Sequence, residues 1–175
     1  MSTPRASDLE IDRILVAVND TADAMAAAQL SAQLAVVRGA QLRAVHATAN
    51  HTIETALRAS HGAEPPTHGP AGATERPAVG ETGGGHGVAE RRRRAGLAVL
   101  ARARRIGDAY GLEIDTALVT GSPGPAVLHA AQAWRADLVV VGRAGRSVQG
   151  EPYVGSQTKH IIEFSEVPVI VVPPP

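Results

Sequence analysis

The sequence predicts a single α/β domain of the doubly wound type, in which helices cover both faces of a parallel sheet. Short, continuous aliphatic runs, typical of strands buried on both faces, alternate with longer segments of helical periodicity. Hydrophobic residues make up 44% of the 175 residues and aromatic residues only 2%, so the core has to be built from Ala, Val, Leu and Ile. This length favours one domain, and this composition favours Ala-rich helices packed on Val- and Ile-rich strands.

The first part of the chain contains two expected strands that flank one helix. The helix is rich in alanine, carries Leu30, Leu34 and Val37 on one face, and ends at a glycine stop, Gly39. The flanking segments are short apolar runs. We therefore expect a flexible tail at residues 1–12, a strand at 14–18, a helix at 21–37 and a second strand at 42–47.

The composition changes abruptly after the second expected strand. From about residue 48 to 87 the chain is rich in Gly, Pro, Thr and His and nearly lacks large apolar residues, as in Pro65-Pro66 and Gly83-Gly84-Gly85. Such a segment cannot bury enough surface to offset the entropy lost on ordering. We predict a flexible, low-complexity insertion at 48–87, within a domain that spans residues 13–175.

Helices and strands alternate again in the second part of the chain. Leu100, Ala103 and Ile106 share a broad face of a predicted helix, and Ser122-Pro123 has the pattern of an N-cap followed by proline at the first helical position. The expected elements are helices at 89–110, from residue 123 and at 155–164, and strands at 112–119, 137–141 and 169–172.

A glycine-rich loop follows the fourth expected strand. Two residues separate Gly142 from Gly145, and nine residues later come Gly155 and Ser156. Glycine lets a ligand approach the backbone without interference from Cβ, and a helix start offers unpaired N–H groups and the positive end of a dipole. Ligands of parallel sheets bind beyond the carboxyl ends of the strands. The loop is therefore a candidate phosphate site, to which Ser156 and Thr158 add hydroxyl donors.

Two common phosphate-binding motifs do not fit this loop. A Walker motif needs Gly-Lys-Ser/Thr after four intervening residues, and the dinucleotide fingerprint has a different spacing and position. On spacing alone, a glycine-rich turn that only connects a strand to a helix fits as well as a binding loop. Arg143 and Arg146 could reach a phosphate, but exposed loop arginines could equally be solvated.

The pattern Gly-x2-Gly-x9-Gly-Ser/Thr after a strand resembles the ATP-binding signature of the universal stress protein family. The resemblance extends to residues 14–18, Val45-His46, 119–123 and the last two strands, and so covers everything except the tail and the insertion. It implies an adenine-nucleotide alpha-hydrolase-like fold, with a five-stranded parallel sheet in the order 3-2-1-4-5 and ATP over the strand ends.

The same resemblance implies which residues hold the nucleotide. Ala47, at the end of the second strand, would bind adenine through its main chain. The loop would hold ribose and phosphates, through which Mg²⁺ or Mn²⁺ would be bound. The implied site, with no catalytic residue and no metal ligand, consists of Ala17, Val18, Asn19, Ala47, Gly142, Arg143, Gly145, Arg146, Gly155, Ser156, Gln157 and Thr158.

The end of the first strand departs from the family pattern, which usually has an aspartate there. This chain has Asn19, followed by Asp20. The amide can donate and accept hydrogen bonds at a nucleotide edge, but as a neutral group it cannot help to hold a cation. Asn19 therefore stays in the implied site, and Asp20 is considered as a substitute for the missing carboxylate.

Three classes of function are compared. An ATP-binding regulatory module of the stress response is favoured. A slow ATPase is the second hypothesis. The sequence argues against it, because it shows no nucleophile–base pair and no obvious carboxylate to activate water. The third is a dimeric interaction module that binds no nucleotide, against which the intact loop argues. A homodimer through Val169–Val172 is expected, because family likeness puts this apolar strand at the edge of the sheet.

Charge and composition disfavour several other classes. Seventeen basic and seventeen acidic residues balance, so the chain has no general field for nucleic acid or an anionic membrane. It has no cysteine, no apolar signal segment and no run of about 20 apolar residues, which favours a cytoplasmic protein. Arg91–Arg94 are interpreted as a solvated helix start and His46 as a core histidine, and the histidines of the insertion lack the spacing of a zinc site.

Overall fold

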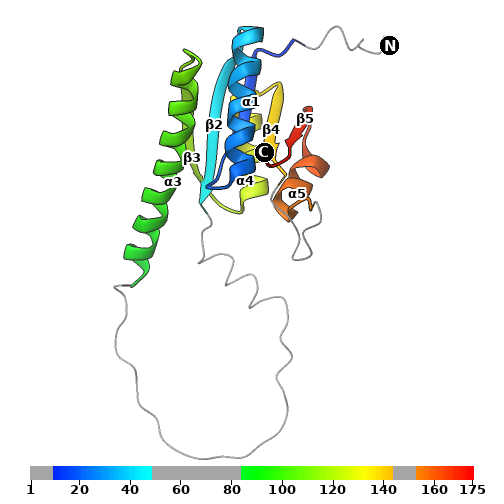
Figure 1. Cartoon of the computed structure of the whole chain (residues 1–175). Coiled ribbons are helices and arrows are strands. Elements are labelled where there is room, and N and C mark those ends of the chain that lie inside the picture. The colour runs from blue at the N-terminus through cyan, green and yellow to red at the C-terminus, as the bar shows by residue number, and fades with distance from the viewer. Residues whose placement is uncertain (1–9, 49–83, 144–152) are drawn as a thin grey trace, which may run out of the picture.

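The structure, a computed structural model, describes residues 10–48, 84–143 and 153–175. Within them, five parallel strands form a sheet in the order β3-β2-β1-β4-β5, which confirms the predicted fold class and strand order (Figure 1). In chain order the elements are β1 (Arg13–Ala17), α1 (Ala22–Arg38), β2 (Gln41–Thr48), α3 (Gly84–Ala109), β3 (Ile114–Thr120), α4 (Pro123–Trp134), β4 (Leu138–Gly142), α5 (Ser156–Phe164) and β5 (Val169–Val172).

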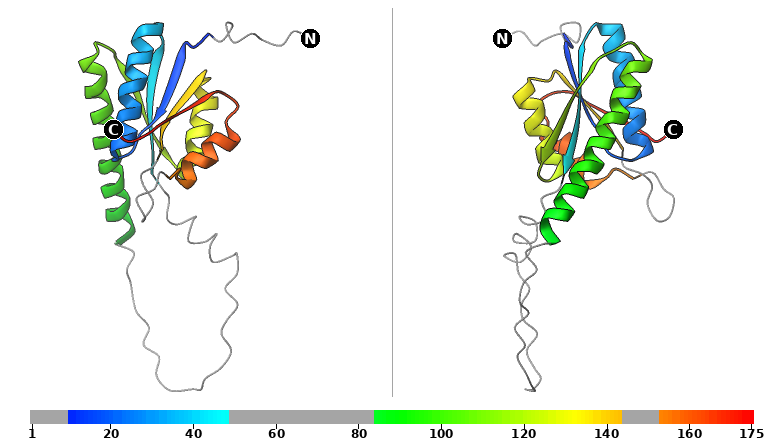
Figure 2. Two further views of the ribbon diagram at one scale, coloured as in Figure 1. Left: turned by 45° about the vertical axis from the view of Figure 1, so that its right-hand side comes forward. Right: turned by 90° about the vertical axis from the view of Figure 1, so that its left-hand side faces the viewer.

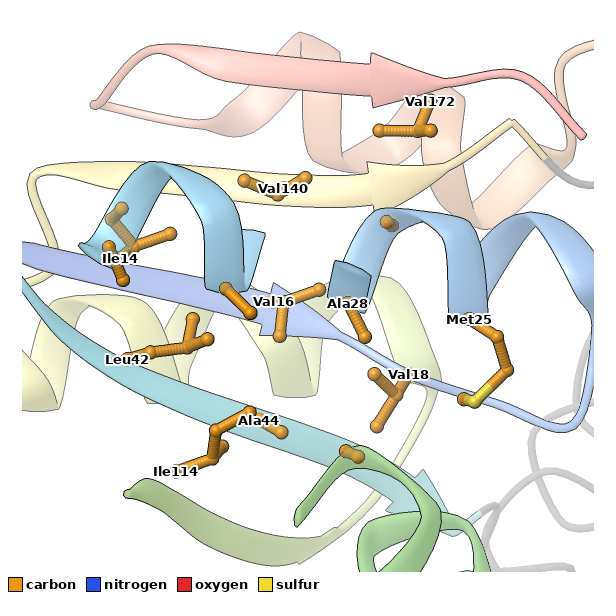
Figure 3. Packing of buried hydrophobic residues seen from close by; sticks show 14 of the residues in the cluster. Ile14, Val16, Val18, Met25, Ala28, Leu42, Ala44, Ile114, Val140 and Val172 are labelled. Atoms are coloured by element: carbon orange, nitrogen blue, oxygen red, sulfur yellow. The ribbon is translucent and has the colours of Figure 1, made fainter. Parts of the chain in front are cut away.

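The sheet lies between two helical layers. Helices α1 and α3 pack on one face, and α4 and α5 pack on the other (Figure 2). Side chains alternate along each strand, so that Ile14 and Val16 of β1 enter the first layer (Figure 3), whereas Leu15 enters the second. All three are fully buried. Burial on both faces explains why the strands are continuously apolar in sequence.

Helix α1 buries its small residues rather than its large ones. Ala28 (Figure 3) and Ala32 are fully buried in the same cluster as Val16, whereas Val37 is 82% exposed. Leu34 is only partly buried at the margin of this cluster. Of the aliphatic face predicted from the sequence, Leu30 and Leu34 pack at the margin of the core, whereas Val37 lies outside it. The strands already supply bulky side chains, so close packing requires small residues on the helix.

Helix α3 starts earlier than the sequence indicated. It begins at Gly84, inside the predicted insertion, and its 26 residues extend past the carboxyl edge of the sheet (Figure 1). Arg91–Arg94 therefore lie within the helix, away from the first turn where its dipole would oppose them. Arg93 and Arg94 approach Glu90 at 3.9 and 3.0 Å as exposed ion pairs along the helix. The earlier start was hidden because glycine is a poor helix former.

The insertion remains a prediction, since residues 49–83 lie outside the described residues. Replacing them with a Gly/Ser linker of about 15 residues should lower the Tm by only a few degrees, because the entropy of loop closure rises slowly with length. Differential scanning calorimetry of the two proteins checks this. A large fall in Tm would instead mean that the segment packs on the core.

Polar contacts near the amino edge of the sheet hold the end of α4. Asp137 Oδ2 accepts the backbone N–H of Arg13 at 2.9 Å, and Arg13 Nη1 donates to the carbonyl of Trp134 at 3.3 Å. The guanidinium of Arg43 lies 4.7 Å from the centroid of the Trp134 ring and also pairs with Asp115. The chain's single tryptophan is thus fixed at the amino edge.

Candidate functional site

A cavity of about 270 Å³ lies at the carboxyl edge of the sheet, between the ends of β1, β2 and β4 and the starts of α1 and α5. In the sheet, β1 lies between β2 on one side and β4 on the other, so the strand order reverses at β1. Ligands of doubly wound sheets bind at such a switch point. The described residues that line it are Ala17, Val18, Asn19, Thr21, Asp23, Ala24, Val45, His46, Ala47, Pro123, Val127, Val141, Gly142, Gly155, Ser156, Gln157, Thr158 and Ile161.

Most residues of the predicted site line this cavity. Arg143 does not: its backbone N–H donates to the carbonyl of Val172 at 2.8 Å, and its buried Nε has no hydrogen-bond partner among the described residues. Gly145 and Arg146 lie outside the described residues. The predicted residues found in the lining are Ala17, Val18, Asn19, Ala47, Gly142, Gly155, Ser156, Gln157 and Thr158.

The first turn of α5 presents backbone N–H groups at the cavity. Gly155 is the N-cap residue, with φ −61° and ψ 153°, and, having no side chain, it makes no capping hydrogen bond. The first N–H groups of a helix have no partner within it and carry the positive end of its dipole. The exposed side chain of Ser156 stands at the same place. This arrangement suits an anionic group.

Thr158 connects α5 to the end of β4. Its side chain is buried, and its hydroxyl donates to the carbonyl of Gly142 at 3.0 Å. Beside it, the N–H of Gly155 donates to the carbonyl of Arg143 at 3.1 Å. The sequence predicted that this hydroxyl would donate to a phosphate, but in the structure it donates to a backbone carbonyl. Thr158 positions the helix start instead.

Gln157 connects α5 to α4. Its Oε1 accepts the backbone N–H of Gly124 at 2.7 Å, in the first turn of α4. Ser122, the expected N-cap residue, makes no side-chain capping bond. Gln157 thus supplies the acceptor that Ser122 was expected to supply, and its side-chain NH₂ remains as a donor at the cavity.

The turn between β1 and α1 is built by a short series of hydrogen bonds. Asn19 Oδ1 accepts the N–H of Thr21 at 3.1 Å and also its hydroxyl, and Thr21 Oγ1 accepts the N–H of Ala24 at 3.4 Å. Asn19 therefore caps the turn and lines the cavity. Asp20 does not line the cavity, because its carboxylate pairs with Arg102 of α3. The suggestion that Asp20 replaces the missing aspartate is wrong.

His46 has a structural partner and also lines the cavity. Its Nδ1 lies 2.8 Å from the carbonyl oxygen of Val18, which can only accept, so Nδ1 carries the proton. The N–H of Val18 donates to the carbonyl of Val45 at 2.9 Å, which ties the ends of β1 and β2 together. His46 is hydrogen-bonded as expected, but the sequence did not indicate its place beside Ala47 in the cavity wall.

Gly142 is required by the helix that packs on it. A Cβ there would lie 2.7 Å from Asp23 Oδ2 and 2.8 Å from the backbone nitrogen of Ala24. The first turn of α1 therefore lies directly against the end of β4. Sequence reasoning assigned this glycine to ligand approach, and it missed Asp23 and Ala24. Only the position of α1 over the sheet brings these residues to the cavity.

Among the described residues, no group of three or more His, Asp or Glu side chains could hold a metal ion. Nor is any described helix both long and apolar enough to cross a membrane.

Comparison with known proteins shows the family to which the chain belongs. The universal stress protein family model matches residues 10–173. The chain belongs to the universal stress protein family. Universal stress protein MJ0531 of Methanocaldococcus jannaschii is 26% identical over 88 residues, which are 50% of this chain and 52% of that protein. The chain thus spans about half the length of this curated relative.

Solved structures of the family have the same fold. A universal stress protein from Archaeoglobus fulgidus in complex with dAMP has a TM-score of 0.58 and 18% identity, covering 93% of this chain and 98% of that one. A universal stress protein in complex with cAMP has a TM-score of 0.60 and 20% identity, covering 93% of this chain and 97% of that one. At these identities the likeness shows a shared fold.

Proposed function

We propose that this protein binds ATP, with Mg²⁺ or Mn²⁺ held through the phosphates, and acts as a nucleotide-dependent regulatory module of the stress response. One observation carries the proposal: the cavity at the strand ends contains the start of α5, whose N-cap residue, Gly155, has no side chain to cap it. The complexes of two family members with dAMP and cAMP support an adenine nucleotide as the ligand.

The chemistry of the lining supports both parts of such a ligand. Val45, Val127 and Ile161 supply apolar surface, which suits the faces of a base. The start of α5 and the hydroxyl of Ser156 supply donors for phosphate oxygens. The main chain at Ala47 offers groups that can read the edge of adenine.

Isothermal titration calorimetry with ATP, ADP and adenosine tests the proposal. Nucleotide extracted from the protein as purified should be an adenine nucleotide, and ATP should bind with a measurable Kd. Absence of ATP binding would refute the nucleotide function and favour the interaction module. A turnover assay then separates a binding protein from a slow ATPase.

We also propose a homodimer through β5, which lies at one edge of the sheet. The carbonyls of Pro168 and Val172 accept N–H groups from β4 and from the residue that follows it, at 3.0 and 2.8 Å. Because successive residues of a strand alternate, Val169 and Val171 turn their backbone N–H and C=O groups away from β4. A copy of β5 related by a twofold axis could pair with them. The flanking prolines would limit that pairing to a few residues.

Ile170→Lys should shift the protein from dimer to monomer, because it puts two like charges near the twofold axis. Size-exclusion chromatography with light scattering measures this at micromolar concentration. Val37→Lys is the matched control, since Val37 is 82% exposed on α1 and should tolerate the charge. Ile170 also contacts the core cluster under α1, so circular dichroism must show that the variant is folded. A monomeric wild-type protein would rule out the arrangement.

A further inference from the structure

The side chain of Arg143, at the end of β4, carries a buried hydrogen-bond donor without an acceptor. Among the described residues, its Nε is the only buried side-chain nitrogen or oxygen atom that has no hydrogen-bond partner. The guanidinium also makes no ion pair with a described residue. A guanidinium has donors only, and a buried donor without an acceptor destabilises the folded state. An acceptor that arrives with a ligand would remove this cost.

The backbone of Arg143 is held between β5 and the start of α5. Its N–H donates to the carbonyl of Val172 at 2.8 Å, and its carbonyl accepts the N–H of Gly155 at 3.1 Å. The bonding of β4 to β5 thus continues through Arg143, and the alternation of side chains along β4 continues with it. Val141 packs in the layer of α4 and α5, whereas Gly142 faces α1. The side chain of Arg143 therefore lies on the face of the sheet that α5 covers.

This position is one residue beyond the wall of the cavity. Gly142 and Gly155 line the cavity, and Arg143, which follows the first and is hydrogen-bonded to the second, does not. No Lys or Arg belongs to the described part of the lining. With the first phosphate of a nucleotide at the start of α5, the phosphates that follow it extend past this wall. A guanidinium beside Gly155 is placed to meet those outer phosphates rather than the first one.

We propose that Arg143 recognises the phosphates beyond the first and makes the protein prefer ATP over AMP. The inference rests on the proposed function. Arginine suits this role, because its N–H groups form strong, charge-assisted hydrogen bonds with phosphate oxygens. In the ligand-free protein the buried Nε–H is uncompensated, and with ATP it gains an acceptor. Removing the guanidinium should therefore lower the affinity for ATP without lowering the stability of the ligand-free protein.

Calorimetry with ATP and AMP, both with Mg²⁺, tests the affinities of the wild type and three variants. The wild type should bind ATP at least about tenfold more tightly than AMP, as expected for hydrogen bonds to a charged group. Arg143→Met should lose this preference through weaker binding of ATP, with unchanged binding of AMP. Arg143→Lys keeps the charge but has a methylene in place of Nε, so it should recover only part of the preference. Arg94→Met is the matched control and should behave as wild type, since it removes the same charge from a side chain of α3 that is 76% exposed.

The stability of the ligand-free protein distinguishes a ligand-binding arginine from a structural one. Methionine has a similar length and no polar hydrogen, so Arg143→Met should have a Tm equal to or above that of the wild type in differential scanning fluorimetry. A clear fall in Tm, or a variant that does not fold, would show that the guanidinium serves the fold and would overturn the inference.

The outcomes separate this inference from the proposed function. A wild-type protein that binds neither ATP nor AMP refutes the function itself. Equal affinities of the wild type for ATP and AMP, or a preference for ATP that survives in Arg143→Met, overturn the role of Arg143 and leave nucleotide binding intact. NMR of the wild type gives a test that needs no variant. The Nε–H signal of Arg143 should shift on addition of ATP and not of AMP, and a signal that ATP leaves unchanged would contradict the contact.

Discussion

Gly155→Val is expected to abolish ATP binding and to leave the fold intact. Gly155 lines the cavity at the N-cap of α5, so a branched side chain there fills the space through which a phosphate would reach the helix start. Its φ of −61° and ψ of 153° are readily adopted by valine, so the backbone should not be strained. We expect at least about a 100-fold loss of affinity in calorimetry, which corresponds to about 2.7 kcal/mol.

Gly87→Val is the matched control for this variant. Gly87 lies on α3 outside the cavity, and a Cβ there would meet no atom within 4 Å. It should bind ATP as the wild type does. Unchanged affinity in Gly155→Val, with an unchanged circular dichroism spectrum, would show that ATP does not bind at the start of α5.

Gly142→Ala is expected to cause a large loss of stability. The new methyl group would lie within 3 Å of the backbone of Asp23 and Ala24, closer than real Cβ contacts. Because backbone cannot rotate aside as a side chain does, α1 must shift away from β4. Overpacking of a core typically costs about 1–3 kcal/mol, and we expect a value near the upper limit. Urea unfolding followed by circular dichroism measures the free energy of unfolding.

Gly87→Ala is the corresponding control for stability. It adds the same methyl group in open space on α3, where alanine is the better helix former. Its free energy of unfolding should equal or exceed that of the wild type. If Gly142→Ala were equally stable, the close approach of α1 to β4 would be wrong.

The fold was predictable because its strongest signals are local. Continuous apolar runs identified the strands, and the loop spacing with its family resemblance located the carboxyl edge. Which face of α1 packs on the sheet was not predictable in the same way. Leu34 and Val37 are more hydrophobic than alanine, but the closeness of helix and sheet decides which face is buried, and Val37 remains exposed. The start of α3 was hidden by the glycines around Gly84.

The parts of the site formed by backbone at the strand ends and at the start of α5 were predictable. The parts formed by side chains from elements far apart in the sequence were less so. Gln157 was selected as a nucleotide contact, yet its oxygen accepts the N–H of Gly124, 33 positions earlier in the chain. Asp23 lines the cavity but carries no local sign of that position, because an acidic residue in a first helical turn commonly serves the helix dipole. Its place beside Gly142 depends on how α1 lies on the sheet, which the sequence does not state.

The position of Trp134 gives the protein a built-in optical reporter of folding. As the chain's single tryptophan, it dominates the intrinsic fluorescence. It lies at the amino edge against Arg43, at the opposite end of the strands from the cavity. Unfolding removes this contact and exposes the rest of the partly buried indole to water, whereas a ligand at the carboxyl edge touches neither partner. Emission from Trp134 therefore follows the folded fraction while remaining insensitive to whether the cavity is filled.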